Sequence, residues 1–371
     1  MIGNNNKSVK EKNQALVMEL VRTNKSISKA DIARKTGLSA NAVGMITSAL
    51  IAKDYIYISG VGESTGGRKP DILSLKPNSC FSIGFDIDTD CVRVAKTDLS
   101  GQVMNINTIM VDCREKPNEA FKIVNSEISK EFCEKLIGVG IAVAGQVCTS
   151  EKIVVNAPNL KWQNVSVKDY IKYPVPVVID NESVASAIYE NFCGMCTETR
   201  NFICINSKSG IGAGIFCNGS IYRGANGSAG EVGHIITDVD GTLCGCGSRG
   251  CLETVASSVR ICEKSGLDSI EAVVERALHK NKKVLSVLKN AAKHLGIAIV
   301  GLANTLNPEK IILGKNFTIY GPLIIEQITE FVKTNGLKQA VDHLEILISD
   351  SGENSSVVGA SLLPQLPIFG K

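Results

Sequence analysis

The sequence predicts an α/β chain in two units, a small N-terminal helical unit with a β-hairpin and a larger two-lobed body. Two short helical segments around a glycine turn, followed by two alternating strands, indicate the first unit. A succession of strands and a helix after residue 80 indicates the body, and a similar succession begins again near residue 201. Residues 1–80 hold 12 Lys+Arg and 6 Asp+Glu, a net charge of +6, whereas the whole chain carries +3. A basic module on a mildly acidic body is expected to meet a polyanion.

Composition is that of an ordinary globular protein. Hydrophobic residues make up 44% and charged residues 21% of the 371 positions, enough for more than one core. We find no run of about 18 apolar residues and no signal-peptide pattern, so we expect a cytoplasmic protein with no membrane partner. The 13 cysteines are an odd number scattered along the chain, which favours free thiols and one metal site over a disulfide framework.

The first 53 residues carry the pattern of a helix-turn-helix. Apolar residues recur at helical spacing over 10–22, and Ser28 with an acid three residues later resembles an N-cap. Ser28 would open a second helix, which stops at Gly37. Ser39 can cap a third helix over 40–53. Two helices joined by a tight glycine turn are typical of DNA-binding helix-turn-helix units.

A β-hairpin wing is predicted next, from strands at 55–59 and 71–75. Its loop holds Gly66-Gly67 followed by Arg68 and Lys69, a pair that can meet phosphates or a narrow minor groove. A solvated turn with incidental charge is the alternative. The third helix contains no Arg, but Asn41 could make a bidentate contact to adenine and Thr47 could bond a phosphate. The expected contacts to double-stranded operator DNA are Lys29, Ser39, Asn41, Thr47, Arg68 and Lys69.

The body is expected to begin after a short linker, which divides the chain into a winged helix-turn-helix at 1–76 and a second domain at 77–371. The order strand, strand, strand, helix, strand is that of the ribonuclease-H-like core of sugar kinases and actin. Two such lobes enclose a cleft, a common place for ligands. We place the smaller lobe at about 77–190 and the larger at about 191–371, with the last helix free to return to the smaller lobe.

A set of motifs gives the body a family resemblance from about Ser82 to Leu363. It closely resembles the ROK family of repressors, open reading frames and kinases, and a winged helix in front looks like the xylose-repressor branch. The motifs are Gly145 after a buried strand, Asn156-Ala-Pro-Asn-Leu-Lys-Trp162, Asp180-Asn-Glu182, Gly210-Ile-Gly-Ala-Gly214, Tyr222-Arg-Gly-Ala-Asn-Gly-Ser-Ala-Gly-Glu-Val-Gly-His234 and Cys244-Gly-Cys-Gly-Ser-Arg-Gly-Cys-Leu-Glu253.

A metal site is predicted from four residues at close spacing, His234, Cys244, Cys246 and Cys251. One imidazole and three thiols make a closed ligand set for structural Zn²⁺, with no open position for catalysis. A cluster of free thiols is the alternative. The resemblance implies the same zinc and places it beside a sugar pocket.

The sugar pocket itself is an implication of the resemblance. Carboxylates and amides that face sugar hydroxyls make charge-assisted hydrogen bonds, which are among the stronger ones. Ordinary surface carboxylates or helix caps are the alternative for each position. The residues that the resemblance assigns to a monosaccharide are Asn159, Asn181, Glu182, Glu231, His234 and Glu253.

Departures from the family's kinase pattern fall on the nucleotide and catalytic side. The kinases carry an Asp-x-Gly-Gly-Thr motif, and this chain has Asp-Ile-Asp-Thr-Asp at the matching positions 86–90. Asp88 and Asp90 therefore stand where the resemblance places phosphates. Glu182 stands at the position of the general base, which is an Asp in the kinases, and Lys208 replaces a glycine of the second phosphate loop. The kinases' Leu-Gly-Gly-Gly on the nucleotide side is replaced by Leu-Gly-Lys-Asn at 313–316. Steric and Coulomb grounds then predict a domain that binds sugar and has lost phosphorylation, with no catalytic residue.

These observations predict a transcription regulator that is a homodimer or homotetramer and acts on a near-palindromic operator. Release from DNA on sugar binding is the commoner behaviour in the family, and xylose is favoured, with glucose, other hexoses and amino sugars left open. One rival is an active sugar kinase with a DNA-binding head. Another is a body that binds a protein partner in place of sugar.

Overall fold

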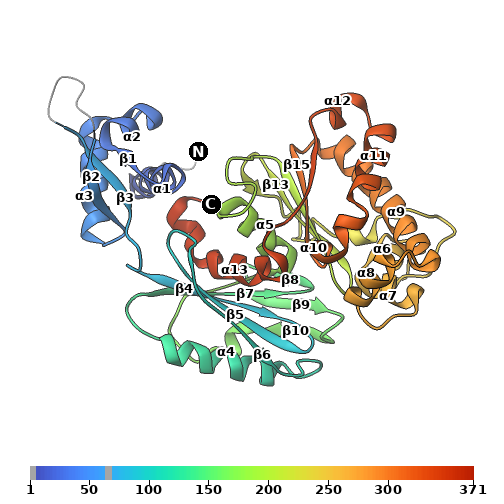
Figure 1. The fold of residues 1–371 in the computed structure, drawn as a ribbon. Helices are drawn as coiled ribbons and strands as arrows, with labels where there is room; N and C mark the ends of the chain where they lie inside the picture. Colours follow the sequence, from blue (N-terminus) through green and yellow to red (C-terminus); the bar gives the residue numbers. More distant parts are fainter. Residues whose placement is uncertain (1–5, 63–68) are drawn as a thin grey trace.

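The computed structural model describes residues 6–62 and 69–371, which form a small N-terminal head and two lobes (Figure 1). The head stands to one side of the smaller lobe and connects to it through a short segment before β4 (Phe81–Ile87). Helix α1 (Asn6–Asn24) of the head packs against η5 (Leu363–Phe369), near the C-terminus. This arrangement is the α/β fold that the sequence predicts.

The head has the elements of a winged helix-turn-helix. The hydroxyl of Ser28 accepts the backbone N–H of Asp31 at 3.1 Å, and Ser39 accepts that of Ala42 at 3.2 Å, so both predicted N-caps are formed. Gly37 ends α2 at φ 71°, a conformation that costs glycine little. The strands form a sheet of order β1-β3-β2. The elements are α1 (Asn6–Asn24), β1 (Ile27–Ser28), α2 (Lys29–Thr36), α3 (Ala40–Ala52), β2 (Ile56–Val61) and β3 (Asp71–Leu75).

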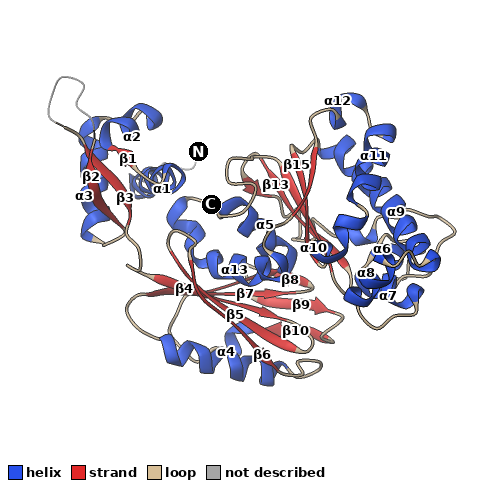
Figure 2. Ribbon diagram, in the orientation of Figure 1, coloured by secondary structure: helices blue, strands red, loops and turns tan. Residues whose placement is uncertain are grey.

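The smaller lobe is built on a five-stranded sheet of order β11-β7-β4-β5-β6. Helix α4 covers one face, and α13 from the C-terminus covers the other (Figure 2). Every strand and helix predicted in this lobe is present within a few residues of its expected place. The elements are β4 (Phe81–Ile87), β5 (Cys91–Asp98), β6 (Val103–Met110), α4 (Pro117–Glu131), β7 (Leu136–Val143), β8 (Gln146–Cys148), β9 (Ile153–Ala157), β10 (Trp162–Ser166), η1 (Val167–Asp169) and β11 (Val177–Asn181).

The larger lobe has a second five-stranded sheet, of order β14-β13-β12-β15-β16, with helices packed beside it. Helix α5 (Glu182–Phe192) follows β11 and leads into this lobe. The elements of the larger lobe are β12 (Phe202–Ser207), β13 (Ile211–Cys217), β14 (Ser220–Ile221), η2 (Val232–His234), α6 (Glu253–Ala256), α7 (Ser258–Ser265), α8 (Ile270–Leu278), α9 (Lys282–Leu306), β15 (Lys310–Lys315), α10 (Phe317–Tyr320), η3 (Gly321–Leu323), α11 (Ile325–Asn335), α12 (Lys338–Val341), β16 (Glu345–Ile348) and η4 (Gly352–Asn354). The chain then returns to the smaller lobe with α13 (Ser355–Leu362) and η5 (Leu363–Phe369).

One helix in the described part of the chain, α9, is long and apolar enough to cross a membrane when judged by length and composition alone. Half of its most apolar window is buried inside the protein, and the helix packs against α11 and α6. Leu288, Leu295 and Ile299 of α9 lie in the core of the larger lobe. These contacts are those of a core helix.

Helix α5 lies between the two lobes and also reaches the head. It packs against α13 and against β12 and β13 of the larger sheet. Phe192 at its last turn shares one apolar cluster with Val17 and Met18 of α1, and Phe369 of η5 belongs to the same cluster. The core of the head is therefore continuous with the core around α5 and the C-terminus.

Candidate functional site

A cavity of about 520 Å³ lies where the two lobes face each other. Its wall takes residues 144–146 and 156–159 from the smaller lobe, and residues 209–212 from the larger lobe. The structure brings all of the sequence-predicted sugar residues to this one cavity: Asn159, Asn181, Glu182, Glu231, His234 and Glu253. Its polar, partly open wall is suited to a small ligand rich in hydroxyls.

Asn181 fixes the start of α5 at the edge of the cavity. Its side-chain oxygen accepts the backbone N–H of Ser183 at 2.7 Å, and its amide donates to the carbonyl of Gly145 at 2.9 Å. The cap sets the direction of the first helical turn, and Glu182 is the first residue of that turn. Asn181 thus positions its neighbour in addition to lining the cavity.

Glu231 and Glu253 approach the cavity from the glycine-rich segment between β14 and α6. Gly230 adopts φ +99°, and a Cβ there would lie 2.0 Å from the carbonyl oxygen of Ala213, so only glycine allows this segment to pack on β13. Burial raises the pKa of the Glu231 carboxyl, while His234 opposes the rise and Glu253 adds to it. The two carboxylates and the imidazole therefore form one electrostatic group.

Asn159 joins the lobes across the mouth of the cavity. Its amide donates to the Ser209 hydroxyl at 2.7 Å, from the loop before β10 to the loop after β12. Several further residues of the wall were not among the predicted sugar contacts, among them Ser209, Gln146 and Arg260. Arg260 lies on α7, outside the family motifs, so no local signal marked it.

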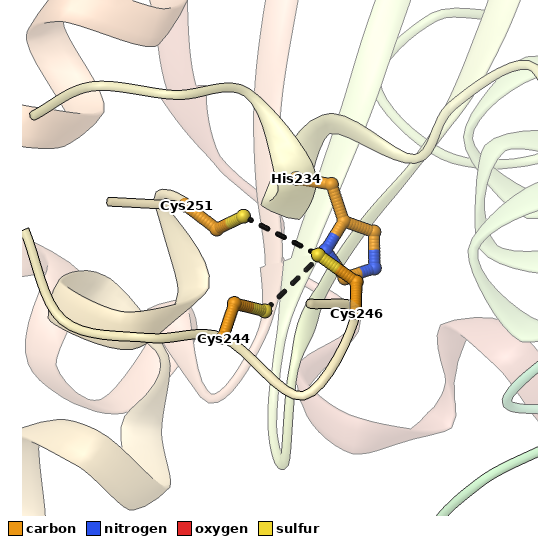
Figure 3. Close-up of side chains that lie close together, drawn as sticks. All are labelled: His234, Cys244, Cys246 and Cys251. Atoms are coloured by element: carbon orange, nitrogen blue, oxygen red, sulfur yellow. Dashed lines mark hydrogen bonds between the residues drawn. The ribbon is translucent and has the colours of Figure 1, made fainter. Parts of the chain in front are cut away.

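The predicted metal ligands form one cluster (Figure 3). The ligand atoms of His234, Cys244, Cys246 and Cys251 all lie within 4.8 Å of one another. The Cys246 and Cys251 sulfurs are 3.6 Å apart, and the Cys244 sulfur is 3.7 Å from His234 Nδ1. A tetrahedral zinc ion with sulfur ligands at about 2.3 Å separates them by about 3.8 Å. The donor set and its spacing therefore fit a four-coordinate ion.

The loop that carries the cysteines is tightly folded. Gly250 adopts φ +70°, and a Cβ there would lie 1.5 Å from the carbonyl oxygen of Asp238. A hydrogen bond from the backbone N–H of Ser248 lowers the pKa of the exposed Cys246 thiol, to about 7. This thiol therefore reaches its metal-binding thiolate form at near-neutral pH.

The ring of His234 faces both the cysteine cluster and the cavity. Its Nδ1 atom is on the side of Cys244, and its Nε2 atom is 4.0 Å from Oε2 of Glu231. One nitrogen can thus serve a metal while the other serves the cavity. Metal-bound histidines commonly use their second nitrogen in this way, which fixes the ring and the tautomer.

Ion pairs lie in the part of the cleft where the family resemblance places a nucleotide in the kinases. Lys315, at the end of β15, is 1% exposed, and its ammonium lies 2.9 Å from Glu182 and 3.1 Å from Asp86. Burial alone would lower the pKa of Lys315, but the carboxylates of Asp86 and Glu182 outweigh it and raise the pKa. Arg93 lies 3.5 Å from Asp86, and Ser356 of α13 donates to the same carboxylate at 2.5 Å.

A second pair lies beside the first. Lys208, after β12, donates to the Asp88 carboxylate, and Arg93 lies 3.5 Å from the same group. Burial alone would raise the pKa of Asp88, but Lys208 outweighs it and holds the pKa well below its usual range. Asp90 is exposed. The charge of Asp88 is therefore balanced by Lys208 of the larger lobe together with Arg93 of the smaller lobe.

Four of the predicted DNA-contacting residues are at least partly exposed. Asn41, Ser39 and Lys69 are exposed, and Lys29 is partly exposed with its ammonium 3.6 Å from Asp71. Arg68 lies outside the described residues.

The predicted phosphate contact of Thr47 is wrong. Thr47 is fully buried, and its hydroxyl donates to the Val43 carbonyl at 2.8 Å, so it supports the core of the head and does not face a phosphate. Met45 and Ser48 instead share the exposed face of α3 with Asn41.

Comparisons with known proteins agree with the family resemblance. The ROK family model matches residues 82–366. The chain is 31% identical over 370 residues to a xylose repressor of Bacillus spizizenii, which covers 95% of this chain and 94% of the relative. It is 32% identical over 317 residues to a glucokinase of Halalkalibacterium halodurans, which covers 76% of this chain and 94% of the relative.

A solved structure with the same fold includes the head. It is a ROK family transcriptional regulator, a homologue of the Escherichia coli MLC protein, with a TM-score of 0.83 and 24% identity over 98% of this chain and 97% of that one. The likeness to the two regulators thus extends over nearly the whole chain, whereas the likeness to the glucokinase extends over 76% of it.

Proposed function

The chain belongs to the ROK family, and we propose that it is a sugar-responsive transcriptional repressor that leaves its operator when a free monosaccharide binds between the lobes. The observation that carries this proposal is the contrast between the two halves of the cleft. The polar residues expected for a sugar line one open cavity, whereas the side expected for nucleotide is filled by buried ion pairs. The alignment to a xylose repressor covers 95% of this chain and so includes the head, which supports the proposal that the head binds DNA.

The effector that we propose to test first is xylose, because relatives named as xylose repressors match almost the whole chain. The cavity of about 520 Å³ has room for a pentose or a hexose. Asn159, Glu182, Glu231 and Glu253 would accept or donate hydrogen bonds to the sugar hydroxyls, with Asn181 and His234 holding these groups in place. In a cytoplasmic setting the free thiols would remain reduced.

Loss of phosphorylation is part of the proposal. A general base needs a carboxylate free to take the proton of the sugar hydroxyl, and Glu182 is bound by the Lys315 ammonium at 2.9 Å. Lys315 and Lys208 also occupy the region where family kinases hold nucleotide. The rival, an active kinase with a DNA-binding head, is favoured by the 32% identity to a glucokinase.

We assign structural zinc to His234, Cys244, Cys246 and Cys251, because their donor set and spacing fit a closed tetrahedral site. When bound, the ion would cross-link the loop and supply no open position for chemistry. The residues of this chain do the rest: the fixed loop orients Glu231, through the second nitrogen of His234, and Glu253, which follows Cys251 by two positions.

Sugar binding would reach the DNA head through α5. This helix of 11 residues begins at the cavity with Glu182 and ends at Phe192, about 16 Å away. Arg22 of α1 donates to the Phe192 carbonyl at 2.6 Å, and its guanidinium lies 4.2 Å from the Phe192 ring. A small shift of α5 would therefore displace the head. In a homodimer or homotetramer with two-fold symmetry, this changes the spacing of the two recognition helices.

The test measures thermal unfolding of the purified, zinc-loaded protein with a panel of free sugars, with and without ATP-Mg. A ligand that binds only the folded state stabilises it by about 2.7 kcal/mol at one hundred times its dissociation constant. We expect one monosaccharide to stabilise the protein, ATP-Mg to have no effect, and the same sugar to release operator DNA selected from random duplexes. Stabilisation by ATP-Mg with sugar phosphate as product would establish the kinase instead.

A further inference from the structure

Lys315 has a backbone conformation that lysine rarely adopts. Its φ is +54°, in the left-handed region where a Cβ is unfavourable and glycine is the usual residue. Among the described residues, Lys25, Lys152, Lys161 and Lys280 also have a positive φ, but each of these is at least partly exposed, whereas Lys315 is buried. What lysine adds over glycine at this buried position is its side chain.

Its contribution is a buried positive charge between the sugar cavity and the smaller lobe. The ammonium lies 2.9 Å from Oε2 of Glu182 and 3.1 Å from Oδ2 of Asp86. Asp86 also contacts Arg93, at 3.5 Å, and the hydroxyl of Ser356, at 2.5 Å. The Glu182 carboxylate, by contrast, accepts its hydrogen bond from Lys315. The two carboxylates therefore depend on Lys315 to different degrees.

Glu182 faces the cavity with a side chain that is 17% exposed. The ion pair with Lys315 fixes the direction of this carboxylate, and a carboxylate oxygen that faces the cavity can accept a charge-assisted hydrogen bond from a sugar hydroxyl. The other charged or titratable groups that line the cavity are Glu231, His234, Cys246, Glu253 and Arg260. They stay the same when Lys315 alone is changed, so the contribution of Lys315 can be isolated.

We propose that Lys315 is a positioning residue for sugar binding: from the larger lobe, it holds the Glu182 carboxylate directed along the cavity wall and ties it to Asp86, and both carboxylates belong to the smaller lobe. This inference rests on the proposed function, because it takes the ligand of the cavity to be a sugar. Lys315 itself need not touch the sugar.

The test compares sugar affinity in wild-type protein, K315M, K208M, E182Q and E182Q/K315M by calorimetric titration at neutral pH, with zinc content measured for each protein. The probe is the monosaccharide that stabilises the wild-type protein. Methionine keeps most of the length of the side chain without its charge. K208M is the matched control, because Lys208 belongs to the same cleft but pairs with Asp88 instead of Glu182.

The readout is the ratio of each variant's dissociation constant to that of the protein from which it differs by one substitution. We expect K315M to raise the dissociation constant at least tenfold, because the Glu182 carboxylate loses its partner, and K208M to raise it less than twofold. In the E182Q background the K315M change should alter the dissociation constant less than twofold, because Lys315 acts through the Glu182 carboxylate. A structural role alone would weaken binding equally in both backgrounds.

Wild-type affinity in K315M, the same loss in K208M, or an equal effect of K315M in the E182Q background would overturn the inference. If K315M does not fold, D86N/K315M carries the test with D86N as its reference, because it removes the other carboxylate that faces Lys315. The same tenfold loss of affinity is expected of it, and an unchanged affinity would again overturn the inference. Failure of the proposed function is distinct, since the wild-type protein would then bind no monosaccharide.

Discussion

Replacing Arg22 by methionine is expected to disconnect the DNA head from the sugar cavity. Arg22 is buried between α1 and the body, where it donates to the carbonyl of Phe192 at 2.6 Å and lies over its ring at 4.2 Å. It also pairs with Glu19 at 2.7 Å. The R22M change leaves Glu19 with a second partner, Lys371 at 3.1 Å, so no isolated buried charge results. The side chain of methionine preserves most of the apolar contact.

The magnitude follows from the contacts that are lost. A hydrogen bond that involves a charged group contributes about 1.5–3 kcal/mol, and a cation–π contact contributes about 0.5–1 kcal/mol. Their sum, about 2–4 kcal/mol, is at least as large as a typical coupling free energy between two sites, about 1–3 kcal/mol or a 5- to 150-fold change in affinity. We therefore expect sugar to change operator affinity by less than about threefold in R22M.

The assay measures operator affinity by fluorescence anisotropy, with and without saturating sugar, and sugar affinity by calorimetry on the free protein. Sugar affinity in free R22M is expected to stay near that of wild type, because the cavity is unchanged. R114M is the control, since Arg114 is an exposed arginine of the body with its own ion pair to Asp112. Full sugar response in R22M, or an equal loss of response in R114M, would refute the route through α5.

Two further predictions concern the metal and the DNA face. The protein should carry one zinc ion per chain by native mass spectrometry, and C251S should lose it and weaken sugar binding at least tenfold, whereas C262S should do neither. Sugar binding of normal affinity by zinc-free C251S would contradict this. N41A should weaken operator binding by about 1–3 kcal/mol without changing thermal stability, because Asn41 is exposed on α3. T47A should lower the free energy of unfolding by about 1 kcal/mol, the scale of one buried methyl group, and should leave operator affinity intact. Weaker operator binding with unchanged stability would contradict the burial of Thr47.

The fold of the head could be predicted because its signals are local. Ser28 and Ser39 cap helices only three residues away, and Gly37 ends α2 through its own backbone conformation. Thr47 was wrong for an equally local reason. A change of one position along a helix turns a side chain by about 100°, and on this helix Thr47 lies on the side of Val43 and Leu50, while Ser48 lies outside.

The cavity wall could be predicted because the family motifs that bear it are contiguous in the sequence, as Asn181-Glu182 and Glu231 to His234 show. Contacts between distant segments could not be predicted in the same way. Arg22 meets Phe192 across 170 positions, and neither residue lies in a motif. Lys315 was visible as a departure from the kinase pattern, but its partners were not.

The structure changes the meaning of those departures, because four of the residues involved form two ion pairs. Lys208 pairs with Asp88 across 120 positions, and Lys315 pairs with Glu182 across 133. In each pair a carboxylate of the smaller lobe meets a lysine of the larger lobe. The two lobes therefore contact each other through ion pairs in the part of the cleft where the family resemblance placed a nucleotide. Under the proposed function, sugar binding in the adjoining cavity would change the free energy of this contact, and a ligand shifts the equilibrium between two lobe arrangements only through such a differential interaction.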